Sequence, residues 1–168
     1  LILEIDTFSF ATIQEFVAPV YPFTLEDNIA LWKSNSEVLY FTQQNNAISI
    51  SSYNVQDDSS SDIVNLTGTV NSPNLSPDGS RIAIGNFETC NGVCIIDITN
   101  NSIQEITTNF GEDYIPERAE EIIWHSSGSW FFIMGRPVGS TRNIDIGSVD
   151  GNIRGIVGRF IISEESAF

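Results

Sequence analysis

The residue types that could support covalent chemistry gather around one histidine. His125 is the single histidine of the 168-residue chain, and three serines follow it closely, namely Ser126, Ser127 and Ser129. A serine nucleophile needs a nearby base, so this cluster would suit a hydrolase. However, the segment lacks the Gly-x-Ser-x-Gly elbow of many hydrolases, and two related segments place Lys33 and Ser76 where this one has His125. We therefore predict no catalytic residue and expect His125 to join a strand to a turn.

A second group of chemically active residues is acidic and lies between two predicted strands. It comprises Glu112, Asp113, Glu117, Glu120 and Glu121. The next interstrand loop, residues 135–142, holds Arg136 and Arg142 and should open on the same face. The arginines could hold an anionic group while the carboxylates attract a cation or a basic peptide; the competing interpretation is a solvated acidic loop. The residues of the predicted binding site are Glu112, Asp113, Glu117, Glu120, Arg136 and Arg142.

The two cysteines, Cys90 and Cys94, could form a disulfide across a hairpin. A three-residue loop with Gly92 near the left-handed region would make them face each other, whereas a two-residue turn at Asn91 and Gly92 would pair Cys94 with Thr89 instead. Both geometries are open at this point. No further cysteine or histidine cluster supplies a zinc site, and no Asp-x-Asp-x-Asp-Gly loop occurs, so we predict no metal and no cofactor.

The net charge of the chain limits the kinds of partner that it can bind. Lys and Arg number 7 against 22 Asp and Glu, which gives a formal net charge of -15. Such a chain is repelled by phosphate backbones and anionic membrane surfaces, so nucleic acid is not an expected partner. Apolar runs such as residues 130–134 are far shorter than the roughly 20 residues of a membrane helix, and we expect no membrane span.

An internal repeat predicts the elements that must position these residues. An aromatic residue or leucine, a tight polar turn and an apolar strand recur three times, with starts 43 and 49 residues apart. The copies are Trp32–Phe41, Leu75–Ile84 and Trp124–Ile133, and they align without gaps. Further alternating strands follow each copy, which makes four strands per unit, as in the blade of a β-propeller. An ordinary β-sandwich is the alternative, but it does not explain the repeat.

The middle copy shows the unit most clearly. Its strands are predicted near Ser72–Ser76, Arg81–Asn86, Val93–Ile98 and Ile103–Thr107. Pro77, Asp78 and Gly79 favour a tight turn between the first two, because proline fixes φ and glycine accepts positive φ. The predicted fold is therefore all-β, a partial propeller of four-stranded antiparallel blades over residues 1–168. Its predicted parts are the end of one blade (1–20), three blades (24–68, 70–109 and 119–158) and the start of another or a tail (159–168).

The middle copy also resembles a known family. Asn74–Ile84, Val93–Ile98 and Ile103–Thr107 are similar to the TolB-like (WD40-like, PD40) propeller repeat, although the other two copies keep the Trp and lose the Pro-Asp pair. The resemblance implies a ring of more blades than this chain supplies, so we expect additional blades from the same polypeptide or a homodimer. Leu1–Ile5 reads like the middle of a strand, so we also expect the chain to begin inside a larger or processed protein.

The expected function is a non-catalytic scaffold that binds a protein or peptide through its loops. The resemblance and the paired cysteines favour a periplasmic or cell-surface location. One alternative is the propeller domain of a larger enzyme, a prolyl-oligopeptidase-like peptidase or a polysaccharide lyase. Another is a carbohydrate-binding propeller that uses Trp32, Trp124 and Trp130, although repeated aromatic positions are more typical of packing between sheets.

Overall fold

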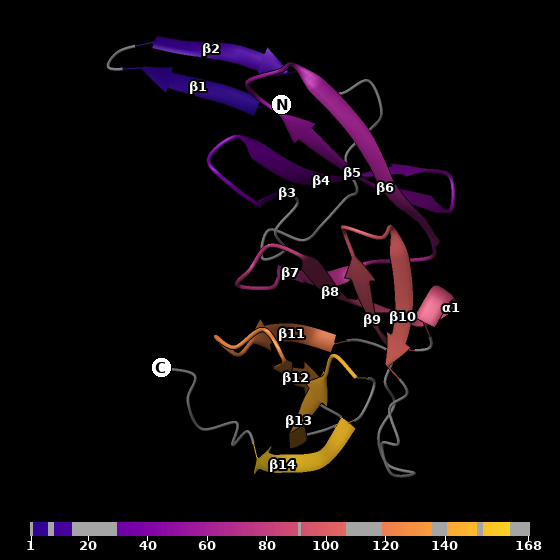
Figure 1. Ribbon diagram of the computed structural model, residues 1–168. Coiled ribbons are helices and arrows are strands. Elements are labelled where there is room, and N and C mark those ends of the chain that lie inside the picture. Colours follow the sequence, from indigo (N-terminus) through magenta and orange to yellow (C-terminus); the bar gives the residue numbers. More distant parts are fainter. Residues whose placement is uncertain are drawn as a thin grey trace, which may run out of the picture.

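Strands make up almost all of the regular structure in this chain. The computed structural model describes residues 2–6, 9–14, 30–90, 92–106, 119–135, 141–150 and 153–161 (Figure 1). Side chains are described for residues 30–85, 89–90, 93–106, 121–134 and 144–150. Within these residues, antiparallel strands form one two-stranded sheet and three four-stranded sheets. The helix content of the described part is one short turn, α1 (Phe87–Cys90), which is much too short to cross a bilayer.

The strands follow the chain in order within every sheet. The N-terminal hairpin consists of β1 (Ile2–Asp6) and β2 (Ser9–Gln14). The first sheet contains β3 (Ala30–Trp32), β4 (Glu37–Gln44), β5 (Ala47–Asn54) and β6 (Ser59–Thr67). The second contains β7 (Asn71–Leu75), β8 (Arg81–Asn86), β9 (Gly92–Asp97) and β10 (Ser102–Ile106). The third contains β11 (Ala119–Trp124), β12 (Trp130–Gly135), β13 (Thr141–Ser148) and β14 (Ile153–Ile161).

The strands predicted for the middle copy lie within one residue of those observed at each end. The C-terminal part differs from the expectation. Residues 159–161, the first part of the segment expected to start a further blade or form a tail, belong to β14, because they pair with residues 141–143 of β13.

The gap-free alignment of the three copies is wrong by one residue in the first copy. In each copy, the residue that ends the first strand pairs with a residue of the second strand. These pairs are Trp32 with Val38, Leu75 with Ile82, and Trp124 with Phe131. The first turn is therefore one residue shorter than the other two. Because side chains alternate between the two faces of a strand, this shift of one residue places each side chain of the first copy's second strand on the face opposite to the one that the gap-free alignment predicts. Leu39 thus corresponds to Ala83, not to Ile82.

Two apolar clusters hold the three sheets together. One fills the space between the first and second sheets and includes Leu39, Phe41, Ile82 and Ile84. The other lies between the second and third sheets and includes Ala83, Ile95, Phe131 and Ile133. The second sheet is thus buried on both faces, and Figure 1 shows it between its two neighbours. Its strands are accordingly apolar at successive positions, as in 82–84 and 93–96.

Candidate functional site

The turns between the first and second strands of the sheets form a row across the molecule. Gly79 has a φ of +72°, and a Cβ built on it would lie 3.4 Å from the Lys33 side chain of the first sheet. Gly128 has a φ of +68°, and its Cβ would lie 4.0 Å from Pro77 of the second sheet. Each turn therefore contacts the turn of the preceding sheet. We call this row the turn face.

Hydrogen bonds inside these turns use most of their polar side chains. Asp78 accepts hydrogen bonds from the hydroxyl of Ser76 at 2.6 Å and from the backbone N–H and hydroxyl of Ser80 at 3.1 and 2.8 Å. These bonds, led by the Ser76 hydroxyl, lower the pKa of Asp78 from 3.8 to about 2. Ser76 in turn accepts from the backbone N–H of Arg81 at 2.9 Å. The carboxylate thus organises its own turn.

His125 occupies the position of Ser76 in the third sheet and makes equivalent contacts. Its backbone N–H donates to Trp130 at 2.9 Å, as that of Ser76 donates to Arg81 at 2.8 Å. Its Nδ1 lies 2.9 Å from Ser127 Oγ and accepts the Ser127 backbone N–H at 3.2 Å. Its ring stacks on Trp130 with centroids 3.9 Å apart. These contacts give His125 a structural role in the turn.

The opposite end of the sheets carries the disulfide. There the chain leaves β8 at Asn86, forms the turn α1 and returns into β9 at Gly92, which pairs with Asn86. A disulfide joins Cys90 at the end of α1 to Cys94 in β9, with their Cα atoms 5.6 Å apart. Neither of the two hairpin geometries considered above occurs, because α1 lengthens the connection and Cys94 pairs with Ile84 of β8. We call this end of the sheets the disulfide face.

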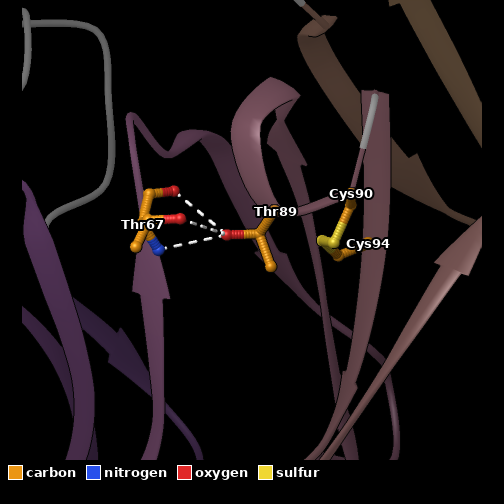
Figure 2. Close-up of a disulfide and its surroundings, with 4 residues drawn as sticks. All are labelled: Thr67, Thr89, Cys90 and Cys94. Carbon is orange, nitrogen blue, oxygen red and sulfur yellow. Dashed lines mark hydrogen bonds between the residues drawn. A yellow bond between two sulfur atoms is a disulfide. The ribbon is translucent and has the colours of Figure 1, made fainter.

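The turn held by the disulfide fastens the first sheet to the second. Thr89 precedes Cys90, and its hydroxyl accepts the backbone N–H of Thr67 at 3.0 Å and donates to the Thr67 carbonyl at 3.1 Å (Figure 2). The two hydroxyl oxygens lie 3.3 Å apart. Thr67 is the last residue of β6, so Thr89 supplies partners for a strand end that the ladder would leave open. We call these bonds the threonine clamp.

A tryptophan fastens the second sheet to the third. The indole Nε1 of Trp124 donates to the main-chain carbonyl of Asn74 at 2.9 Å. The ring packs edge-on against Phe131, with centroids 5.0 Å apart, and 9% of the residue is exposed. Packing is therefore the role of this tryptophan. Trp32, at the same position of the first sheet, is 61% exposed.

Comparison with known proteins identifies this arrangement. No protein-family profile and no curated protein sequence matches the chain. Among solved structures it is similar to TolB from Acinetobacter baumannii, with a TM-score of 0.58 and 14% identity over 89% of this chain and 35% of that chain. The fold is that of a TolB-like β-propeller. The expected fold class is thereby confirmed, and each four-stranded sheet is a blade.

Two further similar structures are enzymes. The tricorn protease matches with a TM-score of 0.59 and 11% identity over 79% of this chain and 13% of that chain. An oligogalacturonate lyase in complex with manganese matches with a TM-score of 0.55 and 10% identity over 74% of this chain and 39% of that chain. This chain therefore spans less than half the length of each of these three structures.

The described strand ends that border the predicted binding residues lie at the disulfide face. In the third blade Ala119 pairs with Gly135, and β13 begins at Thr141, so the acidic segment and the arginine loop attach at this same end. Glu112, Asp113, Glu117 and Arg136 lie outside the described residues. Glu120 and Arg142 lie in β11 and β13, but their side chains are outside the described part. The binding site therefore remains a prediction, although the strand ends from which its two segments leave the third blade are defined.

One buried position carries a different polar group in each blade. In the first blade Ser51 donates to Asp62 at 2.8 Å, and in the second Cys94 forms the disulfide. In the third blade Asp145 is 1% exposed, and neither carboxylate oxygen has a hydrogen-bond partner among the described residues. Burial raises the pKa of Asp145 from 3.8 to about 6. The sequence offered no sign of this, since alternation places Asp145 in an ordinary strand.

Among the described side chains, no three His, Cys, Asp or Glu residues lie close enough together to hold a metal ion. An ion pair between Lys33 Nζ and the Glu37 carboxylate, 2.8 Å apart, lies at the turn face.

Proposed function

We propose that this chain is an extracytoplasmic propeller scaffold whose disulfide face binds a protein or a basic peptide. The observation that carries the proposal is the construction of that face. The disulfide and the threonine clamp hold the ends of β6, β8 and β9 in one frame. Loops on a fixed frame are suited to recognition, because less conformational freedom is lost when they bind. The acidic segment after β10 is attached to this frame.

One further observation supports a scaffold role, and another supports an oxidising compartment. Most polar groups described at the turn face are engaged within their own turns, and the hydrogen bonds of His125 and Ser127 serve local structure. Disulfides persist mainly in secreted and periplasmic proteins, which favours an extracytoplasmic location.

A charge-reversal experiment tests the acidic part of the site. An array of Lys- and Arg-rich peptides is probed with the wild-type protein and with the double variant Glu112→Lys, Asp113→Lys. The matched control is Asp57→Lys, Asp150→Lys, which makes the same charge change at two exposed residues at the opposite end of the sheets, after β5 and β13. We expect the first variant alone to lose the peptides that the wild type retains. Equal binding by all three proteins would refute the basic-peptide proposal.

The second candidate function is the propeller domain of a larger enzyme. It is supported by the tricorn protease and the oligogalacturonate lyase among the similar structures. Assays of the native polypeptide with fluorogenic peptides and with oligogalacturonate test it. Turnover of either substrate that persists in a homogeneous preparation would favour this candidate over the scaffold.

A further inference from the structure

The third blade carries a buried acidic group that the described residues do not neutralise. Asp145 is 1% exposed, and neither of its carboxylate oxygens accepts a hydrogen bond from a described residue. It lies opposite Ile133 in the ladder of β12 and β13, so both side chains lie on the face that packs against the second blade. A buried carboxylate is normally paired with a cation or with hydrogen-bond donors, because burying it alone is costly. Asp145 therefore calls for a partner.

The same position of the other two blades shows from where such a partner comes. Ser51 of the first blade donates to Asp62, and Cys94 of the second blade is joined to Cys90. Both polar groups are buried, and both are satisfied. Cys90 belongs to α1, which leaves the end of β8 at the disulfide face. In the second blade, a group that enters from the disulfide face thus reaches the position that Asp145 holds in the third.

Asp145 lies close to the disulfide face. Its ladder partner Ile133 is two residues before Gly135, the last residue of β12, and two residues of a strand span about 7 Å. Lys and Arg side chains carry their charge at the end of long apolar stems, which suits them to such a depth. The other charged side chains described on the facing side of the second blade, Arg81 and Asp97, lie opposite each other at the turn-face end. The disulfide-face end of this interface is therefore open to a cation from outside.

We propose that Asp145 is the anchor of the site at the disulfide face, where it forms an ion pair with a guanidinium or ammonium group of the bound partner. This inference rests on the proposed function and narrows the partner to one that inserts an Arg or Lys side chain between the second and third blades. The apolar walls there, which include Val93, Ile95 and Ile133, would contact the stem of that side chain. The net charge of -15 attracts cations to the protein.

Binding of the cation should release a proton. Burial raises the pKa of Asp145 from 3.8 to about 6, so the free protein holds a proton there at pH 5, and a bound cation expels it. The probe is a capped Lys- and Arg-rich peptide without His or acidic residues. Isothermal titration calorimetry in two buffers of different ionisation enthalpy counts the protons. At pH 5 the wild type should release close to one proton more than Asp145→Asn, and its affinity should rise between pH 5 and pH 7.

The affinity at pH 7 gives a second measurement. Asp145→Asn should bind the peptide roughly tenfold or more weakly than the wild type. Asp62→Asn is the matched control, because it makes the same change at the carboxylate that Ser51 contacts in the first blade. Asp145→Ser, which copies Ser51, repeats the test with a different side chain. Removal of a buried, unpaired charge should also raise the Tm of the free protein at pH 7. A weaker affinity combined with a higher Tm excludes misfolding as the cause.

The outcomes separate this inference from the proposed function. If Glu112→Lys, Asp113→Lys loses the peptide and Asp145→Asn retains it, the disulfide face binds basic peptides, but Asp145 is not the anchor and the inference is overturned. If no peptide binds, N-acetylargininamide is the probe. It should raise the Tm of the wild type and not that of Asp145→Asn, and equal shifts would overturn the inference. Destabilisation by Arg136→Gln in the wild type but not in Asp145→Asn would also overturn it, because the carboxylate then pairs with the chain's own arginine loop.

Discussion

The ring of Phe131 lies over the backbone of Gly147, its direct partner across β12 and β13. A Cβ on Gly147 would lie 2.5 Å from Cε2 and 2.6 Å from Cζ of that ring. The second blade has Ile82 and Ile96 at these two positions. The third blade therefore fills with a phenylalanine and a glycine the space that two isoleucines fill in the second blade.

Replacing this glycine should destabilise the third blade. Gly147→Ala should lower the free energy of unfolding by about 1–3 kcal/mol, because the ring must leave its position in a packed core. The double variant Phe131→Ile, Gly147→Ile, which copies the second blade, should recover part of the loss. Urea denaturation of the single and double variants measures both effects. Additive losses in the double variant would contradict the idea that the two positions share one volume.

The buried carboxyl group of Asp145 should make stability fall as the pH rises. Its pKa is raised from 3.8 to about 6 by burial, so the folded protein binds the proton more tightly than the unfolded chain does. The contribution of this group is therefore most favourable below pH 3.8, declines between pH 3.8 and 6 and reaches a loss of about 3 kcal/mol above that range. Asp145→Asn should remove this decline.

The measurement is the difference in unfolding free energy between the wild type and Asp145→Asn at several pH values. Only the difference is used, because other carboxyl groups titrate over the same range. A difference that stays constant from pH 4 to pH 7 would show that Asp145 is ionised in the folded protein throughout, contrary to its burial.

Asp78 should act in the opposite direction. Its pKa is lowered from 3.8 to about 2 by the Ser76 hydroxyl and the Ser80 donors, so its stabilising effect is present above pH 3.8 and is lost as the pH falls toward 2. The effect is small because the turn is exposed. Asp78→Asn should lower the melting temperature at neutral pH more than at pH 2. Asp57→Asn, at an exposed hairpin tip, is the control, and an equal shift at both pH values in Asp78→Asn would rule out the carboxylate as the cause.

Removing the disulfide should weaken the join between the first and second blades. Cys90→Ser, Cys94→Ser should cost about 2 kcal/mol, the value expected for a short closed loop. If the disulfide positions Thr89 for the threonine clamp, Thr89→Val should cost less in the cysteine-free protein than in the oxidised one. A double-mutant cycle of unfolding free energies gives this coupling. A coupling energy of zero would mean that α1 keeps its place without the disulfide.

The sequence predicted the second blade well because its turns are specific. Pro77 and Gly79 mark one turn unambiguously, and the observed strands agree with the prediction. The register of the first blade was harder to predict, because residues 38–41 are apolar at every position. They give no period-2 signal that would reveal the shorter turn. The turn α1 was missed for another reason. Four residues carry no helical periodicity, and the disulfide that holds them is a tertiary contact.

The candidate site could be predicted only in outline. Blade topology correctly indicated that the acidic segment and the arginine loop attach at one end of the third blade. The threonine clamp could not be predicted, because Thr67 and Thr89 are 22 residues apart and meet only when two blades stack. The exposure of Trp32 was likewise hidden, since the repeat gives it the same pattern as the buried Trp124.

The burial of the second blade on both faces has a consequence for how the molecule opens. Each blade contacts only its neighbours, so opening should proceed inward from the two ends of the row. The backbone amides of 82–84 and 93–96 should then exchange with deuterium more slowly than those of β3 or β11. In that sequence of events the disulfide sits in the last part to unfold, where a reductant reaches it only after a neighbouring blade has opened.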